Sequence, residues 1–169
     1  MKNPLIKISI PTVDGSFIAR YSDQGLVQLD FPSVREVTSQ ATKDEIVSAK
    51  IRGWHRATVA ALKNVLAGHP AKRLPPIDWS EKTEFQKYVW RALLKIAPGK
   101  TRSYGGVAQA IGKPKAVRAV GGACGANPIP VLVPCHRVLA ANKKLGGFSG
   151  GLDWKRSLLV REGIKIKLD

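Results

Sequence analysis

The sequence predicts an α/β amino-terminal domain, made of a small sheet and a helix, followed by a mainly α carboxy-terminal domain with a helix-turn-helix. Three observations predict this class. Apolar residues alternate near the amino terminus, they recur at helical spacing later in the chain, and a proline-rich segment separates the two patterns. At 169 residues the chain is long enough for two small domains, which we expect at residues 1–78 and 79–169.

Three segments of the amino-terminal part alternate in polarity and predict strands, at residues 5–10, 16–21 and 26–31. The turn formers at residues 22–25 join the last two as a hairpin. Apolar residues from Trp54 to Leu66 follow a helical spacing, and Gly68 is placed to end that helix. Several prolines then predict a linker near residues 70–80.

The carboxy-terminal part is predicted to be mainly helical. Thr83–Gln86 is a capping-box pattern that starts a helix with an apolar stripe reaching Ile96. Further helices are expected at residues 103–111, 116–126 and 152–161. The first two of these flank Gly112 and form the helix-turn-helix candidate. Residues 127–134 contain three prolines and are apolar, which predicts a buried, extended segment.

The charge balance points to a polyanionic partner. Lys and Arg number 28 against 12 Asp and Glu, a formal charge of +16. Such a charge favours nucleic acid first and anionic membrane second, although a basic surface that only aids solubility gives the same count. The amino terminus has no apolar run typical of a signal peptide, and no stretch is long enough to span a membrane. We therefore expect a cytoplasmic protein that binds no membrane.

The chain contains only two cysteines, Cys124 and Cys135, too few for a disulfide framework and without the spacing of a structural zinc site. Cys135 precedes His136. A free thiol has a pKa of about 8.5, so a nearby base is needed to generate the thiolate nucleophile at neutral pH. Glu162 could orient that histidine. The alternative is that Cys135 is a small buried apolar residue and His136 a satisfied core histidine.

The run Asn127–Val138, which reads NPIPVLVPCHRV, closely resembles the active-site signature of the O6-alkylguanine-DNA alkyltransferases. Other stretches that match lie at residues 102–108, 114–123, 147–152 and 162–163. The resemblance covers about residues 81–165, whereas the amino-terminal part matches only in its general layout.

The resemblance implies that Cys135 attacks the alkyl carbon at guanine O6 and keeps the alkyl group as a thioether. His136 would draw the thiol proton through a water while Glu162 orients the imidazole. Because nothing in the chain could hydrolyse the thioether, the protein would be consumed in a single turnover. The reaction requires no cofactor and no metal.

Other members of the family signature also have counterparts here. Tyr104 matches a tyrosine that lies against a DNA phosphate and donates toward the base, and its alternative is a residue that only packs. Arg118 matches an arginine that fills the gap left by a flipped nucleotide. On charge alone, Arg118 would be a phosphate contact or a solvated side chain. Asn127 matches an asparagine that ties the recognition helix to the active-site segment, with a generic turn residue as the alternative.

Residues 117–126 offer few side chains that could read base edges. Small residues such as Ala119, Gly121 and Gly122 let the backbone approach DNA closely, as the family's docking in the minor groove requires. Tight packing on another helix is the alternative explanation. Cys124 lies on this helix, and we interpret it as a packing residue.

The resemblance places the base pocket at Pro134, Val138 and the glycine-rich loop 146–151, with Phe148 and Ser149. Backbone carbonyls of Cys135 and Val138, and amides near Ser149, would read the guanine edge. Phe148 stands where many relatives carry tyrosine, so any contact of that hydroxyl is missing. The amino-terminal part has no cysteine, and His55 and His69 alone do not indicate a metal site.

The expected partner is double-stranded DNA that contains alkylated guanine, with O4-alkylthymine as a further possible substrate. We expect a monomer, and cooperative binding on DNA stays open. An alternative function is lesion binding without repair, as in alkyltransferase-like proteins, but those relatives lack the cysteine. A cysteine hydrolase or a helix-turn-helix regulator would need an acyl-substrate cleft or base-reading side chains that the sequence does not show.

Overall fold

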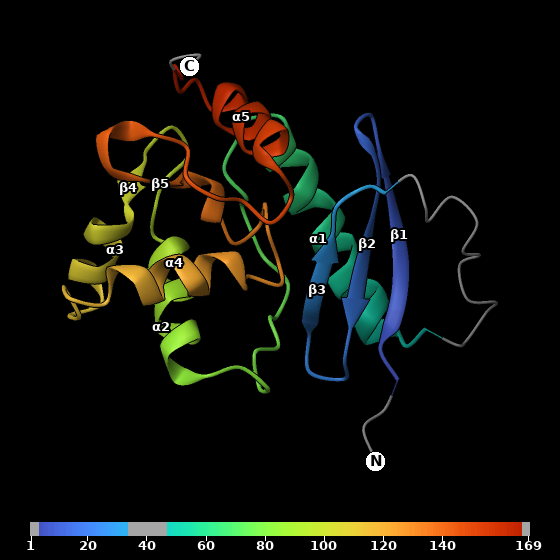
Figure 1. Ribbon diagram of the computed structural model, residues 1–169. Helices are drawn as coiled ribbons and strands as arrows, with labels where there is room; N and C mark the ends of the chain where they lie inside the picture. Colours follow the sequence, from blue (N-terminus) through green and yellow to red (C-terminus); the bar gives the residue numbers. More distant parts are fainter. Residues whose placement is uncertain (1–3, 34–46, 167–169) are drawn as a thin grey trace.

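The computed structural model describes residues 4–33 and 47–166. An antiparallel sheet and one long helix form the amino-terminal part, and short helices form the rest (Figure 1). The strands run in the order β1 (Ile6–Thr12), β2 (Gly15–Tyr21) and β3 (Leu26–Asp30). The predicted α/β amino-terminal part followed by a mainly α carboxy-terminal part is confirmed, and the helix-turn-helix stays a prediction. Within the described residues, no helix is both long and apolar enough to cross a bilayer.

Helix α1 (Ala49–Leu66) begins five residues before the predicted start at Trp54. Ser48 caps it, since its hydroxyl accepts a hydrogen bond from the amide of Ile51 at 3.3 Å. The first turn is largely exposed and carries no apolar stripe, which is why the pattern missed it. The buried face of the helix begins at Thr58 and packs on the sheet.

The linker segment is docked on the sheet. The amide of Leu26 donates to Pro76 O at 2.8 Å, and the amide of Asp78 donates to Leu26 O at 2.9 Å. A Cβ on Gly25 would lie 2.4 Å from Pro76 O, so only glycine permits this approach. The domain boundary near residue 78 stays a prediction. Residues 76–78 contact β3 and do not form a free linker.

Three helices form the other side of the molecule: α2 (Glu84–Leu93), α3 (Tyr104–Ala110) and α4 (Val117–Gly125). The capping box at Thr83 and Gln86 is confirmed. Helix α2 ends at Leu93, before the predicted stripe is complete, and Ile96 is buried in the turn that follows. The indole of Trp90 donates to Ala123 O at 2.8 Å and fixes α4 on α2.

The last helix, α5 (Leu152–Arg161), joins the two halves. The guanidinium of Arg161 binds Asp14, in the turn between β1 and β2, at 2.6 Å and 2.8 Å, and donates to Leu66 O at 3.1 Å. A short parallel pair, β4 (Arg102–Ser103) with β5 (Val138–Leu139), was not predicted. Each strand has only two residues, too short to show a period in sequence.

Candidate active site

The segment 127–134 is buried, as predicted, but it is not extended. The amide of Val133 donates to Ile129 O at 2.9 Å, and Val131 has a φ of 73°, a conformation that β-branched residues rarely adopt. The side chain of Asn127 fastens this turn. Its amide nitrogen donates to Val133 O at 2.8 Å and its oxygen accepts from the Ile129 amide at 3.0 Å. The predicted extended conformation is therefore wrong, because the asparagine replaces missing backbone partners.

Cys135 starts a 3-10 turn, Cys135–Arg137, directly after this segment. Its sulfur accepts a hydrogen bond from the Asn127 amide nitrogen at 3.1 Å, and the residue is 3% exposed. Burial raises the pKa of the Cys135 thiol, although the hydrogen bond from Asn127 opposes the shift. At neutral pH the resting group is a neutral thiol that requires a base.

His136 follows Cys135 and is fully buried against Glu162, the residue that ends α5. The His136 Nε2 atom lies 2.9 Å from the Glu162 Oε1 atom. Burial disfavours the charged carboxylate, but hydrogen bonds from His136 and Arg137 outweigh it and hold the pKa of Glu162 at about 2. Because an ionised carboxylate only accepts, Nε2 carries the imidazole proton. Nδ1, which has no partner among the described residues, keeps a lone pair.

Burial also lowers the pKa of His136, against the opposing effect of Glu162, so the imidazole is neutral at pH 7. A neutral imidazole with a free Nδ1 lone pair can accept a proton. His136 and Glu162 are therefore chemically competent as a base and a group that orients it, and Cys135, the residue before His136, is the candidate nucleophile.

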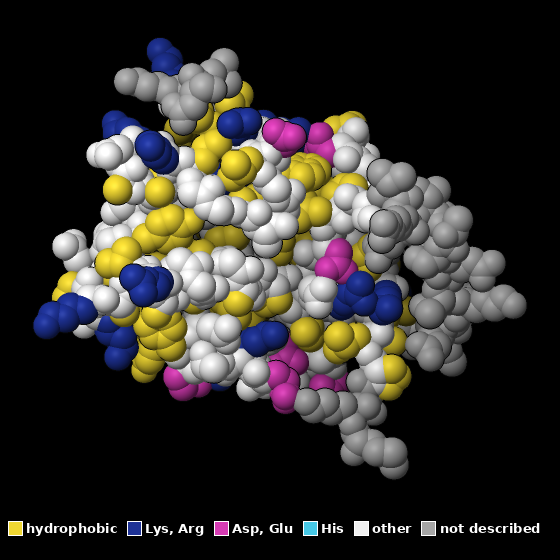
Figure 2. All heavy atoms as spheres, viewed as in Figure 1, with side chains coloured by type: hydrophobic (Ala, Val, Ile, Leu, Met, Phe, Trp, Pro, Cys, Tyr) yellow, Lys and Arg dark blue, Asp and Glu magenta, His cyan; other side chains and the backbone are white. Residues whose placement is uncertain are grey.

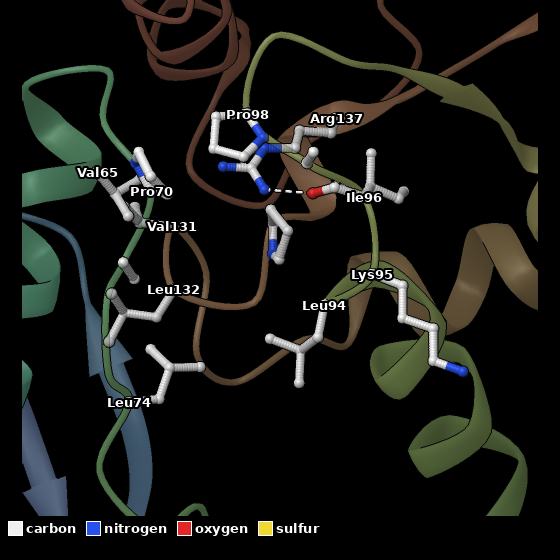
Figure 3. Close-up of a pocket in the computed structure, with 13 residues that line it drawn as sticks. Val65, Pro70, Leu74, Leu94, Lys95, Ile96, Pro98, Val131, Leu132 and Arg137 are labelled. Atoms are coloured by element: carbon white, nitrogen blue, oxygen red, sulfur yellow. Dashed lines mark hydrogen bonds between the residues drawn. The ribbon is translucent and has the colours of Figure 1, made fainter.

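Arg137 holds the carboxylate of Glu162 in place, a role that no pattern in the sequence indicated. Its guanidinium donates to both oxygens of Glu162 at 2.8–3.1 Å and to Ile96 O at 2.5 Å. Figure 3 shows the bond to Ile96 at the edge of a cavity of about 280 Å³ between α1, the docked linker and the segment before Cys135. The sequence shows an arginine two residues after the cysteine, but only the folded structure brings that arginine to Glu162.

Lys155 on α5 was also missed. It is fully buried, and its ammonium donates to the carbonyls of Val138, Leu145 and Gly147 at 2.5–3.2 Å. Burial lowers the pKa of Lys155 to about 8. The sequence did not predict this burial, because lysine side chains are mostly exposed in folded proteins. Its three acceptors fix the start of the glycine-rich loop beside β5.

A second cavity, of about 350 Å³, lies beside Cys135. Its lining includes Tyr104, Cys124, Cys135, Phe148 and Ser149. Cys124 therefore faces the same space as Cys135, although we interpreted it as a packing residue. Burial raises the pKa of Cys124 to about 12, and burial likewise raises the pKa of Tyr104, so both keep their protons at neutral pH.

Two residues predicted for this pocket lie elsewhere. Pro134 and Val138 are buried, and neither lines the cavity beside Cys135. Pro134 instead lines the cavity of about 280 Å³ next to Arg137. The carbonyl of Val138 already accepts from Lys155 at 2.7 Å, so one lone pair is left for a ligand.

The outer face of α4 is small and open. Arg118, Ala119 and Gly122 are exposed, and a Cβ on Gly121 or Gly122 would meet nothing within 4 Å. Tight internal packing therefore does not require these glycines. In Figure 2, Lys and Arg side chains lie on both sides of α4 on this face. The surface can accept a close-fitting polyanion.

His55 and His69, the weak candidates for metal binding, lie in the amino-terminal part of the chain. His55 contacts the hydroxyl of Tyr21 at 3.1 Å. Among residues 4–33 and 47–166, no three His, Cys, Asp or Glu side chains form a group that could hold a metal ion.

The chain is similar to known proteins in sequence. A family model described as 6-O-methylguanine DNA methyltransferase, DNA binding domain, matches residues 84–164. A methylated-DNA–protein-cysteine methyltransferase of Methanosarcina acetivorans is 59% identical over 49% of this chain and 53% of its own length. The chain thus spans about half the length of the first such relatives. One from Methanosarcina barkeri is 39% identical over 88% of this chain and 90% of its own length.

Solved structures are similar in fold. The crystal structure of Mycobacterium tuberculosis OGT in complex with DNA has a TM-score of 0.72 and 39% identity, and the match covers 91% of this chain and 90% of that one. The structure of the M. tuberculosis O6-methylguanine methyltransferase has a TM-score of 0.71 and 33% identity, with 98% of this chain and 96% of that one covered.

Proposed function

This chain belongs to the family of methylated-DNA–protein-cysteine methyltransferases, and we propose that it transfers alkyl groups from O6 of guanine in DNA to its own Cys135. The observation that carries the proposal is the buried Cys135 thiol at a cavity, directly before His136 in the chain, with the His136 Nε2 atom 2.9 Å from the Glu162 Oε1 atom. Family membership alone does not require the histidine and the carboxylate to meet in space.

The Cys135 sulfur performs the displacement. A proton leaves the thiol for Nδ1 of His136, through a water, and the imidazolium that forms is stabilised by the ionised Glu162. The hydrogen bond from Asn127 stabilises the developing thiolate. The sulfur then bonds to the alkyl carbon as the carbon–O6 bond breaks. The departing guanine takes up one proton, so the products are S-alkylcysteine and guanine.

Tyr104 assists the leaving group. It lines the cavity beside Cys135 and keeps its proton, since burial raises its pKa. A hydroxyl donor near the base lowers the cost of the negative charge that develops on guanine. Ser149 and Phe148 line the same cavity and bind the base. The thioether product is stable, so each molecule acts once.

Helices α3 and α4 bind the DNA as a helix-turn-helix that docks in the minor groove. The open glycines and Ala119 on α4 permit close approach of the backbone, and the surrounding Lys and Arg side chains bind phosphates. Guanine O6 lies within the base stack, and Cys135 is 3% exposed, so the nucleotide must flip out to react. Arg118, exposed on α4, fills the gap that the nucleotide leaves.

A role in DNA repair predicts where the protein acts, its oligomeric state and how salt affects its affinity for DNA. It acts on genomic DNA inside the cell, as a monomer, and accepts lesions with little dependence on the surrounding sequence. Its affinity for DNA should fall steeply as salt rises, because phosphate contacts release counterions. An affinity that does not change between low and physiological salt would contradict this use of the +16 charge.

Arg118→Ala tests the flipping role separately from the chemistry. The variant should repair O6-methylguanine in duplex DNA more slowly, by about tenfold for each ~1.4 kcal/mol of lost support for the flipped state. Free O6-benzylguanine needs no flipping and should react at nearly the wild-type rate. Equal slowing of both reactions would contradict the role of Arg118.

Radiolabelled O6-methylguanine DNA tests the function itself. Label that moves to the protein supports repair. Label that stays on tightly bound DNA would instead identify a lesion-binding protein without repair activity. If no label moves and the DNA is not bound tightly, the protein has neither function.

A further inference from the structure

The glycine-rich loop that walls the Cys135 cavity is held at two points. Near its start, the ammonium of Lys155 binds the carbonyls of Leu145 and Gly147. Near its end, the ring of Phe31 covers the backbone at Gly150, where an added Cβ would lie 2.4 Å from the ring. Phe31 follows β3, so this second support comes from the amino-terminal sheet.

Phe31 also meets the pocket residue Phe148. Their ring centroids are 5.8 Å apart at an interplanar angle of 72°, an edge-to-face contact. The ring centroid of Phe31 also lies 5.0 Å from that of Trp154 on α5. The phenylalanine therefore contacts both the helix that carries Lys155 and the side chain that lines the cavity.

The strand behind Phe31 is itself fixed to the active-site segment. The amide of Leu29, on β3, donates to Pro128 O at 2.9 Å, in the turn that Asn127 organises. The position of Phe31 relative to Cys135 is thus set by a backbone hydrogen bond from the preceding strand and by ring contacts of its own side chain. A rigid support of this kind determines how far Phe148 can move.

We propose that Phe31 is a positioning residue that sets the specificity of the alkyl pocket, by holding Phe148 and the Gly150 backbone against the substrate. The proposal rests on the proposed function of Cys135. Small and large alkyl groups should respond differently to its loss. A methyl group reacts well only if the pocket wall holds the base tightly against the sulfur. A benzyl group fills the space that a displaced Phe148 leaves.

Phe31→Leu tests this proposal, with Phe17→Leu as the matched control. Phe17 belongs to the same ring cluster, at 5.7 Å from Phe31 and 5.6 Å from Trp154, and it is fully buried. The cavity beside Cys135 is lined by neither residue. Rates of Cys135 alkylation are measured with O6-methylguanine duplex DNA and with free O6-benzylguanine, after melting curves show that each variant is folded.

We expect Phe31→Leu to raise the ratio of the benzyl rate to the methyl rate by about threefold to tenfold, the equivalent of one ring contact. Phe17→Leu should leave the ratio unchanged, even if it lowers the melting temperature. Phe31→Tyr, which keeps the ring, should restore the wild-type ratio. An unchanged ratio in Phe31→Leu, or an equal change in Phe17→Leu, would overturn the proposal.

A double variant provides an independent test. If Phe31 acts through Phe148, adding Phe31→Leu to Phe148→Leu should change the ratio no further, whereas additive effects would show that Phe31 acts by another route. Failure of the wild-type protein to accept a methyl group at Cys135 would contradict the proposed function instead. The two failures are therefore distinguishable.

Discussion

Each half of the molecule shields a histidine from solvent, His55 partly and His136 completely, but the two surroundings differ. His55 of α1 lies 3.1 Å from the hydroxyl of Tyr21, which donates to Thr58 at 2.9 Å. His136 lies 2.9 Å from the carboxylate of Glu162. Burial lowers the pKa of both histidines. Burial alone therefore does not identify a reactive histidine, whereas a fixed, ionised partner indicates one.

The two halves also differ in their other buried polar groups. Among the described residues, the amino-terminal half buries a neutral one, Thr58, whereas the carboxy-terminal half buries Arg137 and Lys155 as well as His136. Removing a charged group from water costs several kcal/mol, so a buried charge is stable only where hydrogen bonds or an ion pair offset that cost. This difference predicts that matched substitutions will affect the two halves unequally.

The largest difference is expected between His136→Ala and His55→Ala. Loss of a general base should slow alkylation of Cys135 by about 10²–10⁴-fold, whereas loss of His55 should change stability only. Rates with free O6-benzylguanine measure this without a contribution from DNA binding. The wild-type rate should also fall in acid as His136 takes up a proton. Similar slowing by both substitutions would break the distinction between the two histidines.

The next difference concerns two arginine–carboxylate pairs. Glu162 is 1% exposed beside Arg137, whereas Asp14 is 19% exposed beside Arg161. Glu162→Gln leaves a buried guanidinium unpaired and should lower the free energy of unfolding by about 3–5 kcal/mol, against about 1 kcal/mol for Asp14→Asn. Chemical denaturation at pH 7 measures both.

The pH dependence has a definite sign. The pKa of Glu162 is held at about 2, below its ordinary value of 4.5. Its contribution to stability is therefore full above pH 4.5 and is lost as the pH falls toward 2. The unfolding free energy of Glu162→Gln should change less across that window than the wild-type value does. Parallel curves would contradict the ionised state of Glu162.

Two lysines give a smaller difference. Lys155 binds three carbonyls around the pocket loop, whereas Lys50 lies over the ring of Trp54 at 4.8 Å and is exposed. Lys155→Met should slow alkylation by about 10–100-fold through a displaced loop, and Lys50→Met should leave the rate unchanged.

The titration of Lys155 offers a second measurement. Its pKa is about 8, below its ordinary 10.5, so the unfolded chain binds more protons between these values. The lysine therefore makes the free energy of unfolding rise with pH across this window, and Lys155→Met should remove that rise. The same rise in the variant would show that Lys155 is not buried as an ammonium.

The smallest effect sharpens the comparison of two helical glycines. A Cβ on Gly122 of α4 meets nothing within 4 Å, and one on Gly53 of α1 meets only the tip of Arg56 at 4.0 Å. Each Gly→Ala change should stabilise the protein by about 0.5–1 kcal/mol. Only Gly122→Ala should weaken DNA binding, which titration of a labelled duplex measures. Equal DNA affinity in both variants would show that α4 does not contact the DNA.

Local patterns predicted the elements well where a period or a cap was present. The capping box at Thr83 and the cap at Ser103 both lie where the sequence indicated. Missed features depend on contacts between distant residues. The turn around Val131 is fastened by the side chain of Asn127, and the linker pairs with Leu26 across about fifty residues of chain.

The sequence indicated candidate reacting residues but not the residues that support them. Glu162 lies 2.9 Å from His136, which follows Cys135 in the 3-10 turn, and the roles of the three residues stay predictions. Arg137 and Lys155 act through α5, which lies next to the active-site turn only after the chain has folded. Phe31 lies still further away in sequence, directly after the last strand of the amino-terminal sheet. A sequence pattern within one segment cannot reveal such contacts, because they join segments that are far apart in the chain.

Mass spectrometry of the protein after reaction with O6-methylguanine duplex DNA tests the central claim most directly. Cys124 and Cys135 line one cavity, so the experiment distinguishes two buried thiols that differ in their partners. The account predicts one methyl group per molecule, on Cys135, and no transfer in Cys135→Ala. A methyl group on Cys124, several turnovers per molecule, or transfer that persists without the Cys135 thiol would contradict it.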